Sequence, residues 1–126
     1  MAKVIYEDKW SKITTDQLSI KCYFFPLGTS KDIKGTSIKA VYFEEQGGSD
    51  QAFKVKGWGM SLSPCWWACD IRRNCHSSSG PTHYHVVIDC GENLYKGFTV
   101  IDIEKLLASL RLITPPETTF ARHLPF

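Results

Sequence analysis

The residues best suited to chemistry in this chain gather between positions 65 and 90, where cysteines and histidines are dense. Cys65 and Cys69 have a spacing that is found in zinc sites, and more candidate ligands follow. If the segment from Cys65 to Asp70 is a β-strand, however, the two cysteines lie about 13 Å apart at about 3.3 Å per residue, too far to share one ion. The sequence therefore predicts that both are buried small apolar residues on the face of Trp67.

His83 and His85 pass the same test, because residues i and i+2 of a strand point the same way and can converge on one ion. If this strand pairs with the Cys65–Asp70 segment as a hairpin, one register places Asp70 opposite His83. The other face of the strand is the expected core face and carries Tyr84, Val86 and Ile88. The sequence thus offers, as an alternative function, a small metal-binding or catalytic domain that uses His83, His85 and Asp70. The simpler interpretation is three solvated polar residues beside a loop.

A second candidate site is an aromatic surface around Trp58, Met60 and Trp66. An unbroken period of two places Trp58 and Met60 on the expected outer face of their strand. Antiparallel pairing across the following turn sets Met60 opposite Trp66, whose side is shared with Ala68 and Asp70. Aromatic and methionine side chains are enriched in the cores of protein interfaces. We therefore expect this patch to bind another protein or a second copy of the chain, unless a bulge at a nearby glycine turns it into the core.

The length, net charge and composition of the chain exclude several classes of function. With 126 residues, a net charge of +2 and a pI near 8.3, the chain is one domain whose charge predicts neither nucleic acid nor an anionic membrane as partner. The sequence has no apolar stretch long enough for a transmembrane helix and no signal-peptide pattern at its start, which predicts a cytoplasmic protein. Five cysteines, an odd number, favour free thiols over a disulfide framework.

The elements that must position these residues are mostly strands. Leu18, Ile20, Cys22 and Phe24 alternate with polar residues such as Ser19 and Lys21, which predicts a strand of a sheet packed on one side. About seven such strands with short connections favour antiparallel neighbours. The expected fold is mainly β, a strongly bent sheet rolled into a barrel and closed by one C-terminal helix. Glycines 57, 59 and 97 suit bends in that sheet.

The predicted helix spans Phe98 to Arg111, with Thr99 as its N-cap. Its opposite side is expected to carry Glu104, Lys105 and Ser109. The apolar stripe that it must bury against the sheet consists of Ile103, Leu106, Leu107 and Leu110. Residues 112–126 contain three prolines and cannot continue the helix. They form either a free tail or a strap that docks through Phe120, Leu124 and Phe126.

This order of elements resembles a pleckstrin-homology-like (PH-like) barrel, closest to the bacterial-type family, over residues 9–111 of a domain that spans 1–111. The resemblance is carried by ITTDQLSI at 13–20, by KDI at 31–33 with IKAV at 38–41, and by the ending at 98–110. It implies a non-catalytic protein-interaction or scaffolding module that needs no cofactor. In classical members a basic first hairpin loop holds phosphoinositides. Here that loop is Thr14-Thr15-Asp16-Gln17, which has no Lys or Arg, so phosphoinositide binding is not expected.

Overall fold

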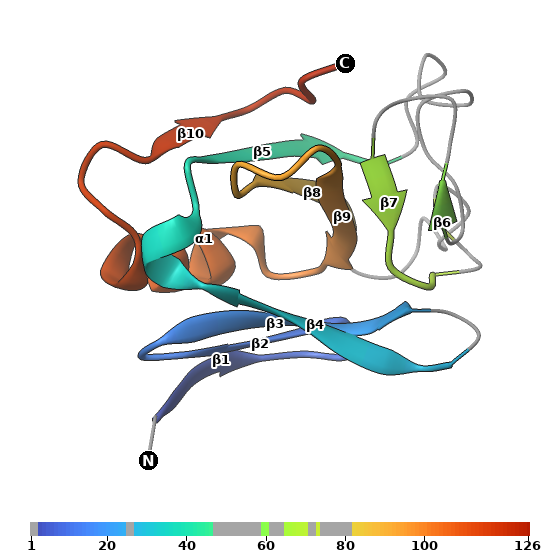
Figure 1. Cartoon of the computed structure of the whole chain (residues 1–126), viewed down its shortest axis with the longest axis horizontal. Coiled ribbons are helices and arrows are strands. Elements are labelled where there is room, and N and C mark those ends of the chain that lie inside the picture. The colour runs from blue at the N-terminus through green and yellow to red at the C-terminus, as the bar shows by residue number, and fades with distance from the viewer. Residues whose placement is uncertain (1–2, 25–26, 47–58, 61–64, 71–72, 74–81) are drawn as a thin grey trace.

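The computed structural model describes residues 3–24, 27–46, 59–60, 65–70, 73 and 82–126, with the backbone alone at Met60. The described residues form a mainly β structure of two sheets, one α-helix and one 3-10 helix (Figure 1). In chain order the elements are β1 (Val4–Glu7), β2 (Ser11–Thr14), β3 (Gln17–Phe24), β4 (Thr29–Lys34), η1 (Gly35–Ser37), β5 (Ala40–Glu45), β6 (Gly59–Met60), β7 (Cys65–Trp67), β8 (Tyr84–Asp89), β9 (Tyr95–Val100), α1 (Ile103–Ile113) and β10 (Thr119–Ala121).

The first sheet has the order β1-β2-β3-β4 and is antiparallel throughout. Ile13, Leu18 and Ile20 are fully buried on its inner face, as the alternation predicts, while its outer face is polar. The alternation fails after Ile20, where the register between β3 and β4 shifts. Tyr23 is buried and Phe24 is exposed, the reverse of the prediction, because this bulge changes which residues face the core.

The second sheet has the order β10-β5-β8-β9-β7-β6 and is mixed, because β7 pairs in parallel with β9 and β10 pairs in parallel with β5. The predicted hairpin between Cys65–Asp70 and the His83–His85 strand is therefore wrong. β8 lies between β5 and β9, and β7 reaches only β9 and β6. The described strands form two facing sheets and do not close into a seven-stranded barrel, so the predicted strand count and layout are also wrong.

The helix begins five residues later than predicted. Residues 98–100 continue β9, and the helix α1 starts at Ile103. Its N-cap is Asp102, whose Oδ1 accepts a hydrogen bond from the Lys105 N–H at 3.1 Å. Thr99, the predicted cap, is fully buried in β9. The predicted stripe faces the core, but Ser109 is also buried because its hydroxyl donates to the Lys105 carbonyl at 2.8 Å, which satisfies the polar group.

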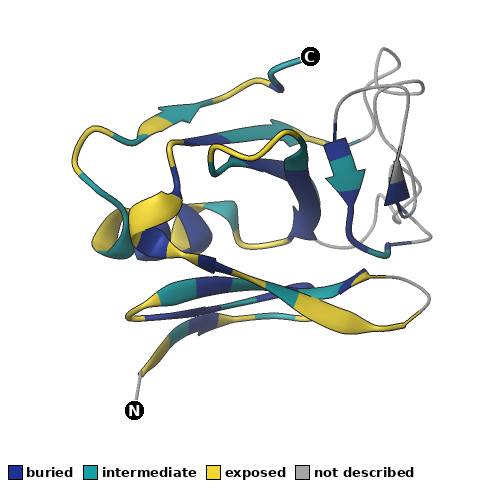
Figure 2. Cartoon of the chain, viewed as in Figure 1, coloured by how far each residue is buried: buried dark blue, intermediate teal, exposed yellow. Residues whose placement is uncertain are grey.

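The core has two parts. The main core lies between the two sheets and is closed at one end by Leu106, Leu107 and Leu110 of α1. A second cluster covers the opposite face of the second sheet, where Leu124 and Phe126 of the C-terminal segment pack. The segment after α1 therefore lies on the body as a strap, tied at its start by β10. Consequently the second sheet is buried on both faces, whereas the first is buried on one (Figure 2).

Gly97 has a packing role rather than the predicted role of a bend. It lies in β9 directly beside Trp67 of β7, which is fully buried. A Cβ atom at Gly97 would lie 2.4 Å from Cε3 of Trp67, closer than any real contact. The absence of a side chain at Gly97 is what lets the indole of Trp67 lie flat against β9.

Candidate functional site

A cluster of buried and half-buried polar side chains surrounds the hydroxyl of Thr99 on β9. We call Gln46, Asp70, Arg73 and Thr99 the Thr99 cluster. The hydroxyl donates to Asp70 Oδ2 at 2.6 Å. It accepts from Arg73 Nη1 at 2.8 Å and from Gln46 Nε2 at 3.0 Å. A hydroxyl has one donor and two acceptor positions, so the hydrogen-bonding capacity of Thr99 is fully used.

Arg73 supplies the positive charge of the cluster although its side chain is almost fully buried. Its guanidinium lies 4.7 Å from the ring centroid of Trp67, and its Nη2 donates to the Ala68 carbonyl at 2.5 Å. Burial lowers the pKa of Arg73 to about 10, against the opposing effect of the nearby Asp70 carboxylate. Arg73 therefore stays charged at neutral pH and ties Ala68 to Thr99 of β9.

The histidines of the predicted metal site lie in aromatic surroundings and not on a solvent face. His85 is fully buried, with its ring edge-on to Trp67 at 5.4 Å between centroids. His83 is half-buried, at 5.5 Å from the ring of Trp10. Asp70 is buried and bound to Thr99, which is the register neighbour of His85 across β8 and β9. In the part of the chain that the structure describes, no three His, Cys, Asp or Glu residues are grouped as a metal ion requires.

The Thr99 cluster has the chemistry of an internal anchor. A catalytic group must reach a reacting atom at hydrogen-bond distance. Here the carboxylate of Asp70 and the guanidinium of Arg73 are buried, and both are engaged by the saturated hydroxyl of Thr99. The arrangement joins the segment after β7 to β9 and satisfies buried polar atoms that would otherwise be costly.

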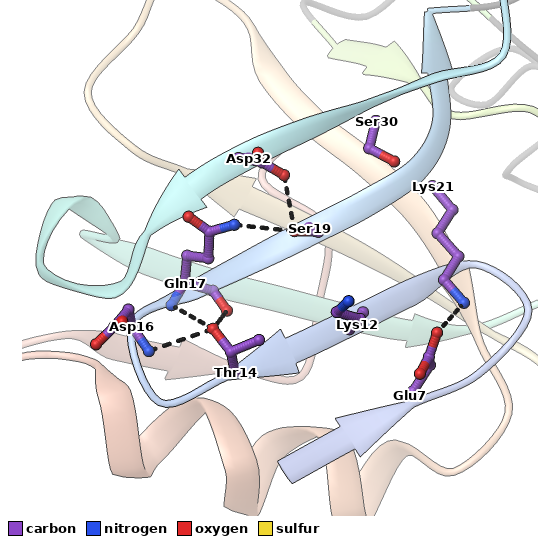
Figure 3. A pocket seen from close by; sticks show the side chains of 9 residues that line it. All are labelled: Glu7, Lys12, Thr14, Asp16, Gln17, Ser19, Lys21, Ser30 and Asp32. Atoms are coloured by element: carbon purple, nitrogen blue, oxygen red, sulfur yellow. Dashed lines mark hydrogen bonds and ion pairs between the residues drawn. The ribbon is translucent and has the colours of Figure 1, made fainter. Parts of the chain in front are cut away.

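A second polar site lies on the outer face of the first sheet. It is an open hollow of about 570 Å³, which we call the sheet hollow, and Figure 3 shows the side chains that line it. They come from β1 to β4 and the turn between β2 and β3. The lining residues are Glu7, Lys12, Thr14, Asp16, Gln17, Ser19, Lys21, Ser30 and Asp32.

Part of this lining is engaged in internal contacts. Lys21 Nζ lies 2.7 Å from Glu7 Oε2 and also donates to the Asp8 carbonyl at 2.7 Å. The hydrogen bond from Lys21 lowers the pKa of the Glu7 carboxyl. Across the hollow, the Ser19 hydroxyl donates to Asp32 Oδ1 at 2.7 Å (Figure 3). These pairs give the hollow a fixed floor of mixed charge.

Three other groups in the hollow make no internal hydrogen bond or ion pair to the described residues. They are the ammonium group of Lys12, the carboxylate of Asp16 and the hydroxyl of Ser30, and no dashed line reaches any of these groups in Figure 3. The hollow therefore presents one cation, one anion and one hydroxyl to whatever lies against it. An enclosed apolar pocket, the usual site of a small ligand, differs from it in both shape and chemistry.

The predicted aromatic patch is described only in part. Trp58 lies outside the described residues, and so does the side chain of Met60. The predicted register is observed, because β6 and β7 are antiparallel with Met60 beside Trp66. Trp66 does not stand clear of the body, since its Nε1 donates to the Tyr23 carbonyl at 2.8 Å and its side chain packs on the main core. Ala68 and Asp70, expected on the same outer side, are both buried.

Sequence reasoning missed the Thr99 cluster more completely than the sheet hollow. Asp70 was singled out, but Gln46 and Arg73 come from loops, where no periodicity indicates a partner. Thr99 was assigned to the helix. The hollow had a visible signal, since Ser19 and Lys21 were expected on the polar face of the first hairpin. The sequence pattern does not indicate that this polar face forms a hollow.

Comparison with known proteins gives no match: no family model, no curated protein and no solved structure corresponds to this chain. Among the described residues, no helix has the length and apolar character needed to cross a membrane.

Proposed function

We propose that the chain is a non-catalytic protein-binding module whose contact surface is the sheet hollow. The observation that carries this proposal is the set of three unengaged groups on a fixed floor: the Lys12 ammonium, the Asp16 carboxylate and the Ser30 hydroxyl. A polypeptide presents acidic, basic and hydrogen-bonding groups within one short segment. Such a segment can meet a cation and an anion together, and charge complementarity of this kind directs specificity and association rate.

The composition of the hollow argues against an anionic ligand. It holds two lysines, Lys12 and Lys21, against three carboxylates, and Lys21 is already bound to Glu7. A phosphate group prefers convergent Arg or Lys donors, which the hollow does not offer. This agrees with the expectation from the first hairpin loop that phosphoinositides are not the ligand.

The resemblance to the PH-like family supports the same function class, because it implies a binding or scaffolding module. Two facing sheets with a helix at one end are compatible with that resemblance, and membership of the family is part of the proposal. The predicted patch of Trp58, Met60 and Trp66 stays a second candidate surface for a protein partner or for self-association.

The test is site-specific photo-crosslinking in extracts of the native cell. A photoreactive amino acid at Ser30 should give a discrete adduct with one protein, whereas the same probe at the exposed Glu117, outside the hollow, should not. Exchanging the charges by Lys12→Glu with Asp16→Lys should abolish the adduct. The matched control is Glu104→Lys with Lys105→Glu on the exposed side of α1, which also conserves net charge.

The proposal fails if the adduct survives the exchange in the hollow, or if the exchange on α1 removes it equally. The melting temperatures of the two probe-bearing proteins and of the two charge-exchanged proteins must agree within a few degrees. Loss of the adduct then reports lost binding and not unfolding. If only Trp66→Ser removes the adduct, the partner binds at the aromatic patch and not at the sheet hollow.

A further inference from the structure

Two cysteines face each other where the first sheet meets the segment after β7. Cys22 lies in β3, and Cys69 follows β7. The Cys69 N–H donates to the Cys22 carbonyl at 2.9 Å, and the two side chains influence each other electrostatically. Both cysteines are free and half-buried. Residues 47 positions apart in the sequence are thus joined at the main chain, with their thiols on neighbouring segments.

The backbone at Cys22 is bent to make this contact. Within the described part of the chain, Cys22 is the one non-glycine residue with a positive φ, of 52°. It lies at the bulge where the pairing of β3 with β4 shifts between Ile20 and Phe24. A residue with a side chain rarely adopts this conformation, and such strained positions concentrate at functional sites. The bulge directs Cys22 toward the second sheet.

The backbone contact brings the two residues near each other. A hydrogen bond of 2.9 Å joins the Cys69 N–H directly to the Cys22 carbonyl. Disulfides are found at Cα separations of about 4.4 to 6.8 Å, a range that residues joined by one main-chain hydrogen bond can reach. A bond between the two sulfurs therefore requires only a local adjustment of the two segments.

We propose that Cys22 and Cys69 are a redox site that forms a reversible disulfide and so links the first sheet covalently to the second. The oxidant is a low-molecular-weight disulfide such as oxidised glutathione. The thiolate of Cys22 attacks one sulfur of this oxidant, which breaks its S–S bond, leaves a mixed disulfide on Cys22 and releases one glutathione. The sulfur of Cys69 then loses its proton, attacks the Cys22 sulfur and releases the second glutathione. Two protein thiols are oxidised and one external disulfide is reduced.

The environment of Cys69 favours this order of events. Burial raises the pKa of the Cys69 thiol, and the neighbouring Cys22 raises it further, with Arg73 acting in the opposite direction. A raised pKa keeps Cys69 protonated at first, and it becomes the resolving thiol once the mixed disulfide stands beside it. The thiolate is the attacking form in such exchange.

The test is oxidation of the intact chain with oxidised glutathione, followed by alkylation of free thiols and digestion with trypsin. Cleavage after Lys21, Lys31, Lys56 and Arg72 gives the peptides 22–31 and 57–72. We expect these two peptides to be linked, with fragmentation placing the bond on Cys69 and an alkyl group on Cys65. The linked protein should melt about 5 to 15 °C higher than the reduced protein, because the bond closes a long loop, and dithiothreitol should reverse the shift.

Cys69→Ser should lose both the linked peptide and the shift. Cys90→Ser, which removes a half-buried thiol elsewhere, should keep both. A bond between Cys69 and Cys75, mixed glutathione disulfides alone, or an unchanged melting temperature would each overturn the proposal. Because the mapping uses the unmutated chain, a variant that fails to fold does not affect the outcome.

Discussion

The two sheets use polar side chains in opposite ways. In the first sheet one face is core and the other is open, so that polar groups such as those of Lys12 and Asp16 have no internal partner among the described residues. In the second sheet both faces are covered, and the polar groups of Asp70 and Arg73 are both bound to the hydroxyl of Thr99. Similar residue types thus stand open in one sheet and hold the structure together in the other.

This difference has an energetic consequence that can be measured. Removing one member of a buried polar group leaves its partners unsatisfied and away from water, which is far more costly than the net value of the hydrogen bond. On an open face, water replaces the lost partner. Matched substitutions in the two sheets should therefore differ in their effect on the free energy of unfolding.

The largest effect is expected for Arg73→Met, which removes a buried guanidinium that binds Thr99 and lies near the Asp70 carboxylate. Removing one charge from a buried group of opposite charges costs about 3 to 5 kcal/mol. The matched change in the first sheet is Lys21→Met, which removes the partly exposed Lys21–Glu7 pair and should cost far less, because water screens an exposed pair. Urea titrations at neutral pH measure both. Equal losses of unfolding free energy in the two variants would mean that Arg73 does not hold the segment after β7 to the second sheet.

The next effect is expected for the hydroxyl of Thr99. Thr99→Val keeps the shape but removes the group that binds Asp70, Arg73 and Gln46, so we expect a loss of about 1 to 3 kcal/mol. The matched change is Ser19→Ala, whose hydroxyl binds Asp32 on the exposed face, and its cost should be under about 0.5 kcal/mol. A Ser19 loss as large as that of Thr99 would remove the contrast between the sheets.

A smaller loss is expected where the second sheet passes into the helix. Asp102→Ala removes the N-cap of α1 and should cost about 0.5 to 2 kcal/mol. The neighbouring Ile101→Ala, at an exposed position that caps nothing, is the control and should cost less. Circular dichroism during denaturation follows the helix directly. If Asp102→Ala is silent, the start of α1 is held by packing rather than by its cap.

The sequence predicts the first sheet well because its pattern is local. Alternation of apolar and polar residues in β2 and β3 depends on water on one side, and that condition holds, so Leu18, Ile20, Ser19 and Lys21 lie as expected. The prediction fails at Cys22, where the bulge serves a contact with Cys69 far away in the chain. A local pattern contains no signal for such a contact.

The second sheet was predicted poorly for the same physical reason. His85 was expected in water because it alternates with Val86, but Trp67 from another strand covers it and the C-terminal strap packs on the same face of the sheet. Thr99 resembles an N-cap in sequence, yet the strand pairing of β9 with β8 continues to Val100. Segments far away in the sequence determine which face of the sheet is covered and how far a strand stays paired. The periodicity of a single strand contains no information about such segments.

The smallest effect concerns one ion pair of each sheet under acid. Lys96 holds the pKa of the Glu92 carboxyl below its ordinary value near 4.5, and Lys21 does the same for Glu7. A lowered folded-state pKa gives stability that is present above the ordinary value and is lost as the pH falls through the folded pKa. The Lys96 side chain is 6% exposed and that of Lys21 is 33% exposed, so the Glu92 pair is screened less by water.

Glu92→Gln should therefore destabilise the protein at pH 7 by at most about 1 kcal/mol, and Glu7→Gln should have the weaker effect. Both differences from the parent protein should shrink as the pH falls below about 4.5 and through the lowered folded-state pKa values, because the parent carboxyls then become protonated. Urea titrations at neutral pH and at acidic pH measure this. If the Glu7 variant loses more stability than the Glu92 variant, burial of the cation does not set the strength of these two ion pairs. The difference between the two sheets would then hold only for their buried polar groups and not for these ion pairs.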